Sequence, residues 1–313
     1  ASGAASADSG SGEAPAFAYK RRLGTVGLIL PTSLCSGQVA QMIARRMNGK
    51  RLGEARGVTH FTALPHTEGC GNSGGQAEQL YVRTMLGYAR HPLVGPCLML
   101  EHGCEKTHND FMRSKMAEAG VDPARLGYAS IQLDGGIEKV TEKVESWFAE
   151  RLAQPESGAA AEIGSLATLR VGLMCDGDAG AEEARQLARL ARWIVAAGGT
   201  VVVPENSPLA ASADFIGNVA ADPSAVRPTL GYGAFAQRSG FHIMEAPTDH
   251  WLETLTGLAA TGVELVAALA GRASLPTHPF VPVLQLAPRA AADAAGAQKA
   301  PLIVVPASGG ARM

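Results

Sequence analysis

The regular alternation of short apolar runs with amphipathic segments constrains the fold of this chain more than any other feature. Each apolar run is followed by a polar, Gly-rich loop and then by a segment with apolar residues at helical spacing. The expected strands are 25–30, 58–64, 93–100, 126–133, 169–174, 200–203, 240–244, 263–269 and 281–286. Such repeats of strand, loop and helix predict an α/β fold with parallel sheets and helices on both faces.

Local composition predicts how the chain is divided. Its start is almost entirely Ala, Ser, Gly, Pro and acidic residues, which bury too little apolar surface to order a segment, so we expect a disordered tail over residues 1–17. Residues 154–165 are similarly polar and Ala-rich and are interpreted as a linker. The prediction is therefore a first α/β domain over 18–153 and a second over 166–313.

Charge and hydropathy argue against two classes of partner. The 27 basic and 29 acidic residues give a net charge of −2, without the basic excess typical of a nucleic-acid-binding protein. No apolar run approaches the roughly 20 residues of a membrane-spanning helix. The chain begins without Met and shows no secretory signal. We therefore expect a cytoplasmic protein without nucleic-acid or membrane partners, and we interpret the chain as a piece of a longer protein.

Four of the five cysteines occupy the same position relative to a predicted strand. Cys35, Cys70, Cys104 and Cys175 each follow a strand and precede its helix, whereas Cys97 lies inside a strand and is expected in the core. Loops of this kind meet at the carboxyl edge of a parallel sheet, where ligands bind. A helix N-terminus lowers the pKa of a thiol, and thiolates suit iron, zinc or an iron–sulfur cluster. We therefore predict a metal site formed by these four thiols.

The same loops carry further groups suited to acid/base chemistry: His66, Glu68, His102, Glu105, Lys106, His108, Asp110 and Asp134. Together with the thiols they predict a metal-assisted acid/base site. Two alternatives remain. The Gly-rich loops could bind phosphate at helix N-termini, although GxxxxGK[ST] does not occur. The thiols could be redox groups, although no CxxC occurs. Four further histidines are interpreted as ordinary residues, namely His60, His91, His242 and His250.

The cysteines lie in motifs that follow one another in a recognisable order. These are ILPTSLCS at 29–36, HTEGCG at 66–71, LEHGCE at 100–105 and GLMCDG at 172–177, with RHPLVG at 90–95, AGGT at 197–200, GRAS at 271–274 and VPVLQL at 281–286. Over residues 24–286 the series resembles the sugar-acid dehydratase family. That family includes altronate dehydratase, galactarate dehydratase and the large subunit of sulfolactate sulfo-lyase.

The resemblance implies an iron-dependent lyase of the hydro-lyase type. Such an enzyme eliminates water from a sugar acid or related 2-hydroxy acid to give a 2-keto-3-deoxy acid, with Fe²⁺ or an iron–sulfur cluster as cofactor. The reaction needs a base and a Lewis acid. The candidate catalytic residues are His66, His102, Lys106 and Glu105, with Lys106 or Arg113 as the carboxylate clamp. The candidate substrate-binding residues are Thr32, Ser33, Asn72, Arg113 and Asp134.

The chain also departs from the family's pattern. It reads Arg22-Leu-Gly where relatives have an Arg-Asn pair, and Pro-Thr-His278-Pro where they tend to have Gly-Cys-Lys. We find no segment of this sequence that resembles the small N-terminal domain of the family. A non-catalytic or partner-dependent ligand-binding subunit is therefore the alternative function. The expected partners are a small hydroxy acid and either further copies of the chain or a separate small N-terminal domain or subunit.

Overall fold

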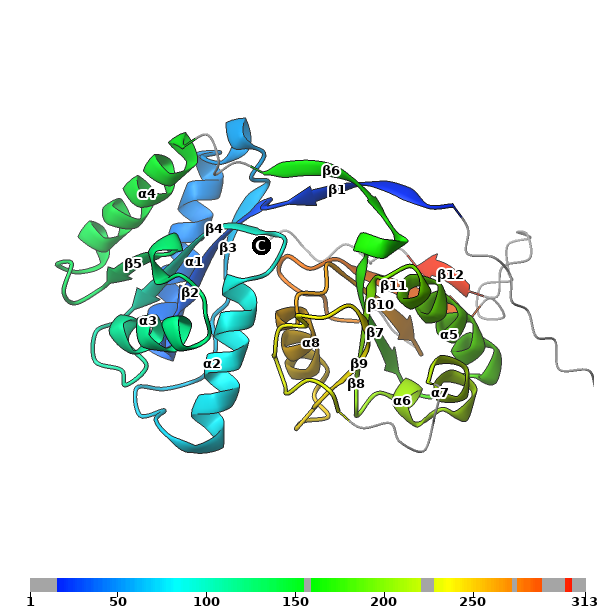
Figure 1. Ribbon diagram of the computed structural model, residues 1–313. Helices are drawn as coiled ribbons and strands as arrows, with labels where there is room; N and C mark the ends of the chain where they lie inside the picture. The colour runs from blue at the N-terminus through cyan, green and yellow to red at the C-terminus, as the bar shows by residue number, and fades with distance from the viewer. Residues whose placement is uncertain (1–15, 155–158, 221–227, 272–274, 289–301, 306–313) are drawn as a thin grey trace, which may run out of the picture.

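Two mainly parallel sheets lie side by side, with helices between them and on their outer faces (Figure 1). The computed structural model describes residues 16–154, 159–220, 228–271, 275–288 and 302–305. The arrangement confirms the α/β class that the alternating strand and helix signals predict. Within the described residues, no helix has the length and hydropathy needed to cross a membrane.

The first sheet is built from the first four predicted strands. They are β2 (Val26–Pro31), β3 (His60–Ala63), β4 (Val94–Glu101) and β5 (Gly127–Ser130), and the helices are α1 (Leu34–Gly49), α2 (Gly75–Ala89), α3 (Asn109–Glu118) and α4 (Ile137–Ala153), with short 3-10 helices η1 (Glu54–Arg56) and η2 (Pro123–Arg125). All neighbouring strands are parallel, in the order β3-β2-β4-β5. Helices α1 and α4 cover one face, where Ile43 and Phe148 are fully buried, and α2 and α3 cover the other.

The second sheet follows the same plan with one antiparallel edge strand. Its strands are β7 (Arg170–Asp176), β8 (Thr200–Pro204), β9 (Gly240–Met244), β10 (Leu265–Ala270), β11 (Val283–Pro288) and β12 (Leu302–Val305), and its helices are η4 (Leu166–Thr168), α5 (Ala181–Ala196), α6 (Pro208–Ala211), α7 (Ala213–Val219) and α8 (Trp251–Ala260). The order is β12-β11-β10-β7-β8-β9, and β12 runs antiparallel to β11. Strands are therefore added on both sides of β7, as in doubly wound folds.

An antiparallel ribbon that the sequence did not predict connects the two sheets. Strand β1 (Ala18–Leu23) pairs with β6 (Ala160–Ser165) above the rest of the molecule (Figure 1). Arg21 joins the ribbon to the second sheet through an ion pair with Glu264. Strand β6 occupies part of the segment interpreted as a linker. Residues 1–15 and 155–158 lie outside the described residues, and the domain boundaries stay a prediction.

The two sheets share one apolar core, because α2 and α8 pack against each other between them (Figure 1). The cluster runs from Leu28 in the first sheet through Met85 and Leu258 to Val266 in the second. Close approach of the two helices requires Gly87, where a Cβ atom would lie 2.2 Å from the Ala260 carbonyl oxygen.

Two histidines lie at this junction, His91 buried and His278 half-buried. His91 donates from Nε2 to the Val263 carbonyl and accepts the Leu93 N–H at Nδ1. His278 stacks on Tyr88 and accepts the Val281 N–H at Nδ1. Burial lowers the pKa of His91 to about 4, and burial together with repulsion from His91 lowers the pKa of His278 to about 3. Both imidazoles are therefore neutral in the folded protein.

We expect the free energy of unfolding to decrease as the pH falls below about 6.5. The unfolded chain binds protons at these histidines at a higher pH than the folded chain does, so each contributes a slope of up to about 1.4 kcal/mol per pH unit. Urea titrations between pH 6.5 and 5 measure the slope before most carboxylates protonate. His278→Gln should reduce it, and the exposed control His250→Gln should not. An equal slope in His278→Gln would show that His278 does not titrate on unfolding.

Candidate active site

The loops after β2, β3 and β4 bring three of the predicted metal ligands together at the carboxyl edge of the first sheet. Cys70 Sγ lies 3.6 Å from Cys104 Sγ, and the Cys70 side chain also hydrogen bonds with Cys35. Cys104 Sγ lies 3.3 Å from His102 Nδ1. Backbone hydrogen bonds hold these loops to one another, since the Lys106 N–H donates to the Cys70 carbonyl. Segments far apart in the sequence thus form one group of three thiols and one imidazole, which we call the thiol cluster.

Cys175 does not join the thiol cluster. It ends β7 in the other sheet, where it is buried and its thiol donates to the Gly177 carbonyl at 3.1 Å. Burial and the neighbouring Asp176 carboxylate raise its pKa to about 11. Its position in its own strand–loop–helix unit matches the prediction, but that unit belongs to a different sheet.

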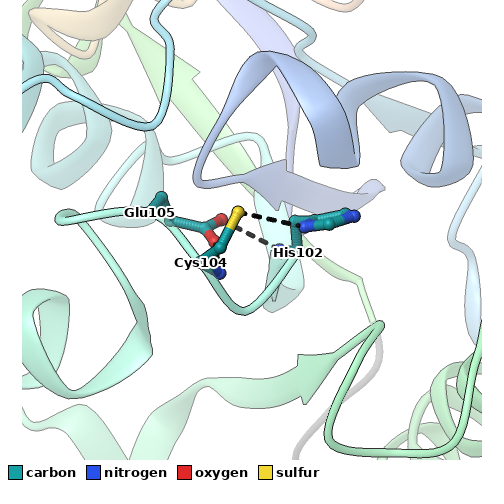
Figure 2. A group of neighbouring side chains, drawn as sticks. All are labelled: His102, Cys104 and Glu105. Carbon is teal, nitrogen blue, oxygen red and sulfur yellow. Dashed lines mark hydrogen bonds between the residues drawn. The ribbon is translucent and has the colours of Figure 1, made fainter.

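Glu105 organises the loop after β4. Its two carboxylate oxygens accept five hydrogen bonds of 2.7–2.9 Å. The donors are the hydroxyls of Thr32 and Ser33 and the backbone N–H groups of His102, Gly103 and Cys104. Figure 2 shows Glu105 on the same loop as His102 and Cys104, and their potential ligand atoms lie within 4.8 Å of one another. The carboxylate therefore connects this loop to the start of α1.

The hydrogen bonds of Glu105 assign it a positioning role. Burial raises the pKa of the carboxyl group, but the hydrogen bonds from Thr32 and the loop N–H groups lower it more, to about 2. The ionised group uses both oxygens in these contacts and Glu105 is 3% exposed, so the carboxylate holds the loop in place. Thr32 and Ser33 are fully buried and donate to it, so their hydroxyl groups support the loop as well.

His66 is held in a comparable way. Its Nε2 donates to the Pro31 carbonyl at 2.9 Å, and its Nδ1 accepts the Glu68 N–H. The ring packs edge-on against Tyr81, and burial lowers its pKa. Because both ring nitrogens are used within the loop, His102 is the better placed of the two candidate acid/base histidines.

The thiol pKa values differ from the expectation of a lowered value at helix N-termini. Hydrogen bonding to Cys70 and repulsion by its charge raise the pKa of the Cys35 thiol. The Cys70 hydrogen bond, burial and repulsion together raise the pKa of Cys104. The effect of neighbouring thiols on these pKa values therefore exceeds the effect of the helix N-terminus, since one thiolate disfavours ionisation of the next thiol. A bound cation would offset this repulsion, which suits the cluster to a metal.

The predicted substrate-binding residues occupy different surroundings. The Asn72 Nδ2 atom is buried and has no hydrogen-bond partner within the described residues. Lys106 is exposed close to the thiol cluster. Arg113 and Asp134 line a separate pocket of about 350 Å³ next to Gly103. There Arg113 pairs with Asp110, and Asp134 with Lys143, both at 2.7 Å. The two predicted clamp residues thus lie on neighbouring parts of one sheet edge.

Three residues that the sequence analysis did not single out also shape this edge. Buried Glu101 accepts the N–H of Asn109 at the start of α3. Tyr81 and Thr107 both donate to the Thr32 carbonyl, which fixes the loop that leads into α1. Glu101 lies inside a motif noted above, but nothing in the sequence indicates its partner.

The fold and this site define a parallel α/β protein with a thiol and imidazole centre at a sheet edge. Residues 18–155 match the model of the family described as D-galactarate dehydratase/Altronate hydrolase, second domain. This match confirms the resemblance for the part of the chain that contains all three clustered thiols. No curated protein matches the chain.

Proposed function

We propose that the protein is an iron-dependent lyase that eliminates water from a sugar acid or related 2-hydroxy acid. The observation that carries this proposal is the convergence of Cys35, Cys70, Cys104 and His102 at one sheet edge. These residues lie within the segment that matches a family of sugar-acid dehydratases. The product would be a 2-keto-3-deoxy acid.

The donor set of the thiol cluster fits a soft metal ion. Cys35, Cys70 and Cys104 would hold it, because thiolates favour iron over hard cations such as Mg²⁺. The Sγ separation of 3.6 Å between Cys70 and Cys104 resembles the edge of a tetrahedral thiolate site, about 3.8 Å for metal–sulfur bonds of about 2.3 Å. This spacing suits two thiolates bound to the same metal atom. When bound, iron supplies a Lewis acid that polarises the departing hydroxyl group.

His102 is the proposed base. Its Nδ1 contacts Cys104, and within the described residues no hydrogen bond occupies its Nε2. With Nδ1 protonated and directed at sulfur, Nε2 is free to take the proton next to the substrate carboxylate. Glu105 holds the His102 backbone N–H and so positions the imidazole. The base and the thiols are thereby fixed on one short loop.

The substrate carboxylate would be bound by Lys106 and Asn72. Lys106 is exposed and forms no ion pair within the described residues, and Asn72 has a buried amide nitrogen without a partner. A carboxylate oxygen is an acceptor for both donors. The adjoining pocket with Arg113 and Asp134 is also lined by polar side chains such as His108 and Lys143, which suit the hydroxyl groups of a sugar chain.

Elimination assays on anaerobically purified, iron-loaded protein test this function. A panel of aldonates and aldarates should include one that yields a 2-keto acid. His102→Gln should lower kcat by about 100-fold or more while iron content is retained, since general-base catalysis typically contributes 10²–10⁴-fold. The exposed control His250→Gln should leave kcat unchanged.

Two results would overturn the proposal. Full activity in His102→Gln would show that His102 is not the base. Absence of turnover of every panel member by iron-loaded protein would contradict the proposed lyase activity. Binding of an aldonate without turnover, followed by activity when a partner chain is added, would identify the partner-dependent subunit instead.

A further inference from the structure

A second cavity lies at the edge of the first sheet opposite to the thiol cluster. It has a volume of about 640 Å³ and is bounded by the starts of β4 and β5 and by the ends of α2, α3 and α4. Strands of six residues span about 20 Å, so the thiols are remote from it. The cavity is therefore separate from the proposed active site.

Positive charge dominates this cavity. Its lining includes Arg90, Arg125 and Arg151 but only one carboxylate, that of Asp122. The Asp122 carboxylate accepts the Ala124 N–H. Within the described part of the chain, none of the three arginines forms an ion pair with a carboxylate. Three guanidinium groups thus share one cavity without neutralisation.

The segments that carry these groups are fixed in place. Arg90 lies over the ring of Phe235, 5.5 Å from its centroid. The segment after Arg90 is held where the Gly24 N–H donates to the Pro92 carbonyl at 2.9 Å. Arg151 donates to the side chain of Gln154. Two of the three cations are thus positioned by contacts that leave their charge available.

We propose that this cavity binds a small organic dianion, a phosphate ester or a dicarboxylate. Guanidinium groups match the oxygen pairs of both anions with bidentate hydrogen bonds. The volume falls in the usual range for small-molecule sites, about 300–1,000 Å³.

Such a ligand would bind at the junction of the two sheets. The lining takes Leu23 and Gly24 from the chain between β1 and β2, Ala160 from β6 and Phe235 from the second sheet's side of the molecule. A ligand that binds only the folded arrangement stabilises it by a free energy that rises with the ratio of ligand concentration to Kd. Binding should therefore raise the Tm.

Calorimetric titration with two probes, inorganic phosphate and succinate, tests this proposal at constant ionic strength set with NaCl. We expect saturable binding of at least one probe, and the preferred probe distinguishes a phosphate ester from a dicarboxylate. Arg125→Gln and Arg151→Gln should each weaken binding by about tenfold or more, as expected for loss of a charge-assisted hydrogen bond. Arg45→Gln, an exposed arginine on α1, is the charge-matched control.

Arg125 is exposed, so its variant should fold with the wild-type Tm, which a thermal scan without probe verifies. Absence of saturable binding, or equal binding by Arg125→Gln, Arg151→Gln and Arg45→Gln, would overturn the assignment. Because the cavity is remote from the thiols, removal of iron should leave the affinity unchanged.

Discussion

Replacement of Cys70 by serine is expected to abolish the proposed iron binding and to lower kcat by more than about 100-fold, beyond the usual effect of an outer-shell substitution. Cys70 is the thiol that contacts both Cys35 and Cys104, so its loss separates the other two. Serine is a harder and weaker ligand for iron than thiolate. Elemental analysis of anaerobically purified protein measures the metal, and the elimination assay measures kcat.

Cys175→Ser is the matched control for Cys70→Ser. Cys175 lies in the other sheet and bonds to the Gly177 carbonyl, so its variant should retain iron and activity. Loss of iron from Cys175→Ser would instead support the four-thiol site predicted from the sequence. Full iron content in Cys70→Ser would contradict a metal site in the thiol cluster.

Glu105→Gln is expected to lower the free energy of unfolding by about 3 kcal/mol near neutral pH, as estimated from the lowered pKa. The carboxylate accepts five hydrogen bonds, whereas a glutamine amide would direct its NH₂ group at one set of these donors. Urea denaturation followed by circular dichroism measures the change. His102 and Cys104 would lose their backbone anchor as well, so iron content should decrease in the same variant.

The pH dependence separates this effect from a general packing defect. The folded pKa of Glu105 lies below that of the unfolded chain, so its stabilisation is complete above about pH 4.5 and is lost as the pH falls toward 2. The stability difference between wild type and Glu105→Gln should therefore shrink over this range. Glu142→Gln, an exposed change on α4, should leave the urea midpoint unchanged. A difference that persists at pH 2 would argue against the assigned role.

Much of the fold could be predicted because its parallel strands are buried on both faces. Such strands appear as continuous apolar runs, and the run at 93–100 coincides with β4 to within a residue at each end. The prediction at 126–133 was too long, because β5 ends at Ser130 where Asp134 accepts the Ser130 N–H. A local side-chain hydrogen bond ends that strand while the apolar pattern continues.

The ribbon of β1 and β6 could not be predicted in this way. Most side chains of β6 are exposed and β1 contains three consecutive basic residues, so neither strand has an apolar run. Their pairing joins residues that are far apart in the sequence, such as Ala18 and Ser165. Charged contacts such as Arg21 with Glu162 and Glu264 support the ribbon, and hydropathy carries no signal for them.

The candidate site was predictable in its location but only partly in its membership. Position after a strand identifies Cys35, Cys70 and Cys104 as neighbours. Cys175 also follows a strand, and the same rule therefore includes it wrongly, because its strand belongs to the other sheet. A linear pattern does not show which strands share a sheet. It also does not show which atoms a side chain contacts, so Glu105 and His66 could not be recognised as loop anchors from residue type alone.

The shared core between the sheets has a consequence for how the molecule can be divided. Truncation after α4 would expose Tyr88 and Met85, which the second sheet's helix α8 helps to cover. It would also deprive β1 of its only strand partner within the described residues. Either half expressed by itself would expose a large apolar surface to water. We therefore expect that neither half folds independently and that the two form one cooperative folding unit.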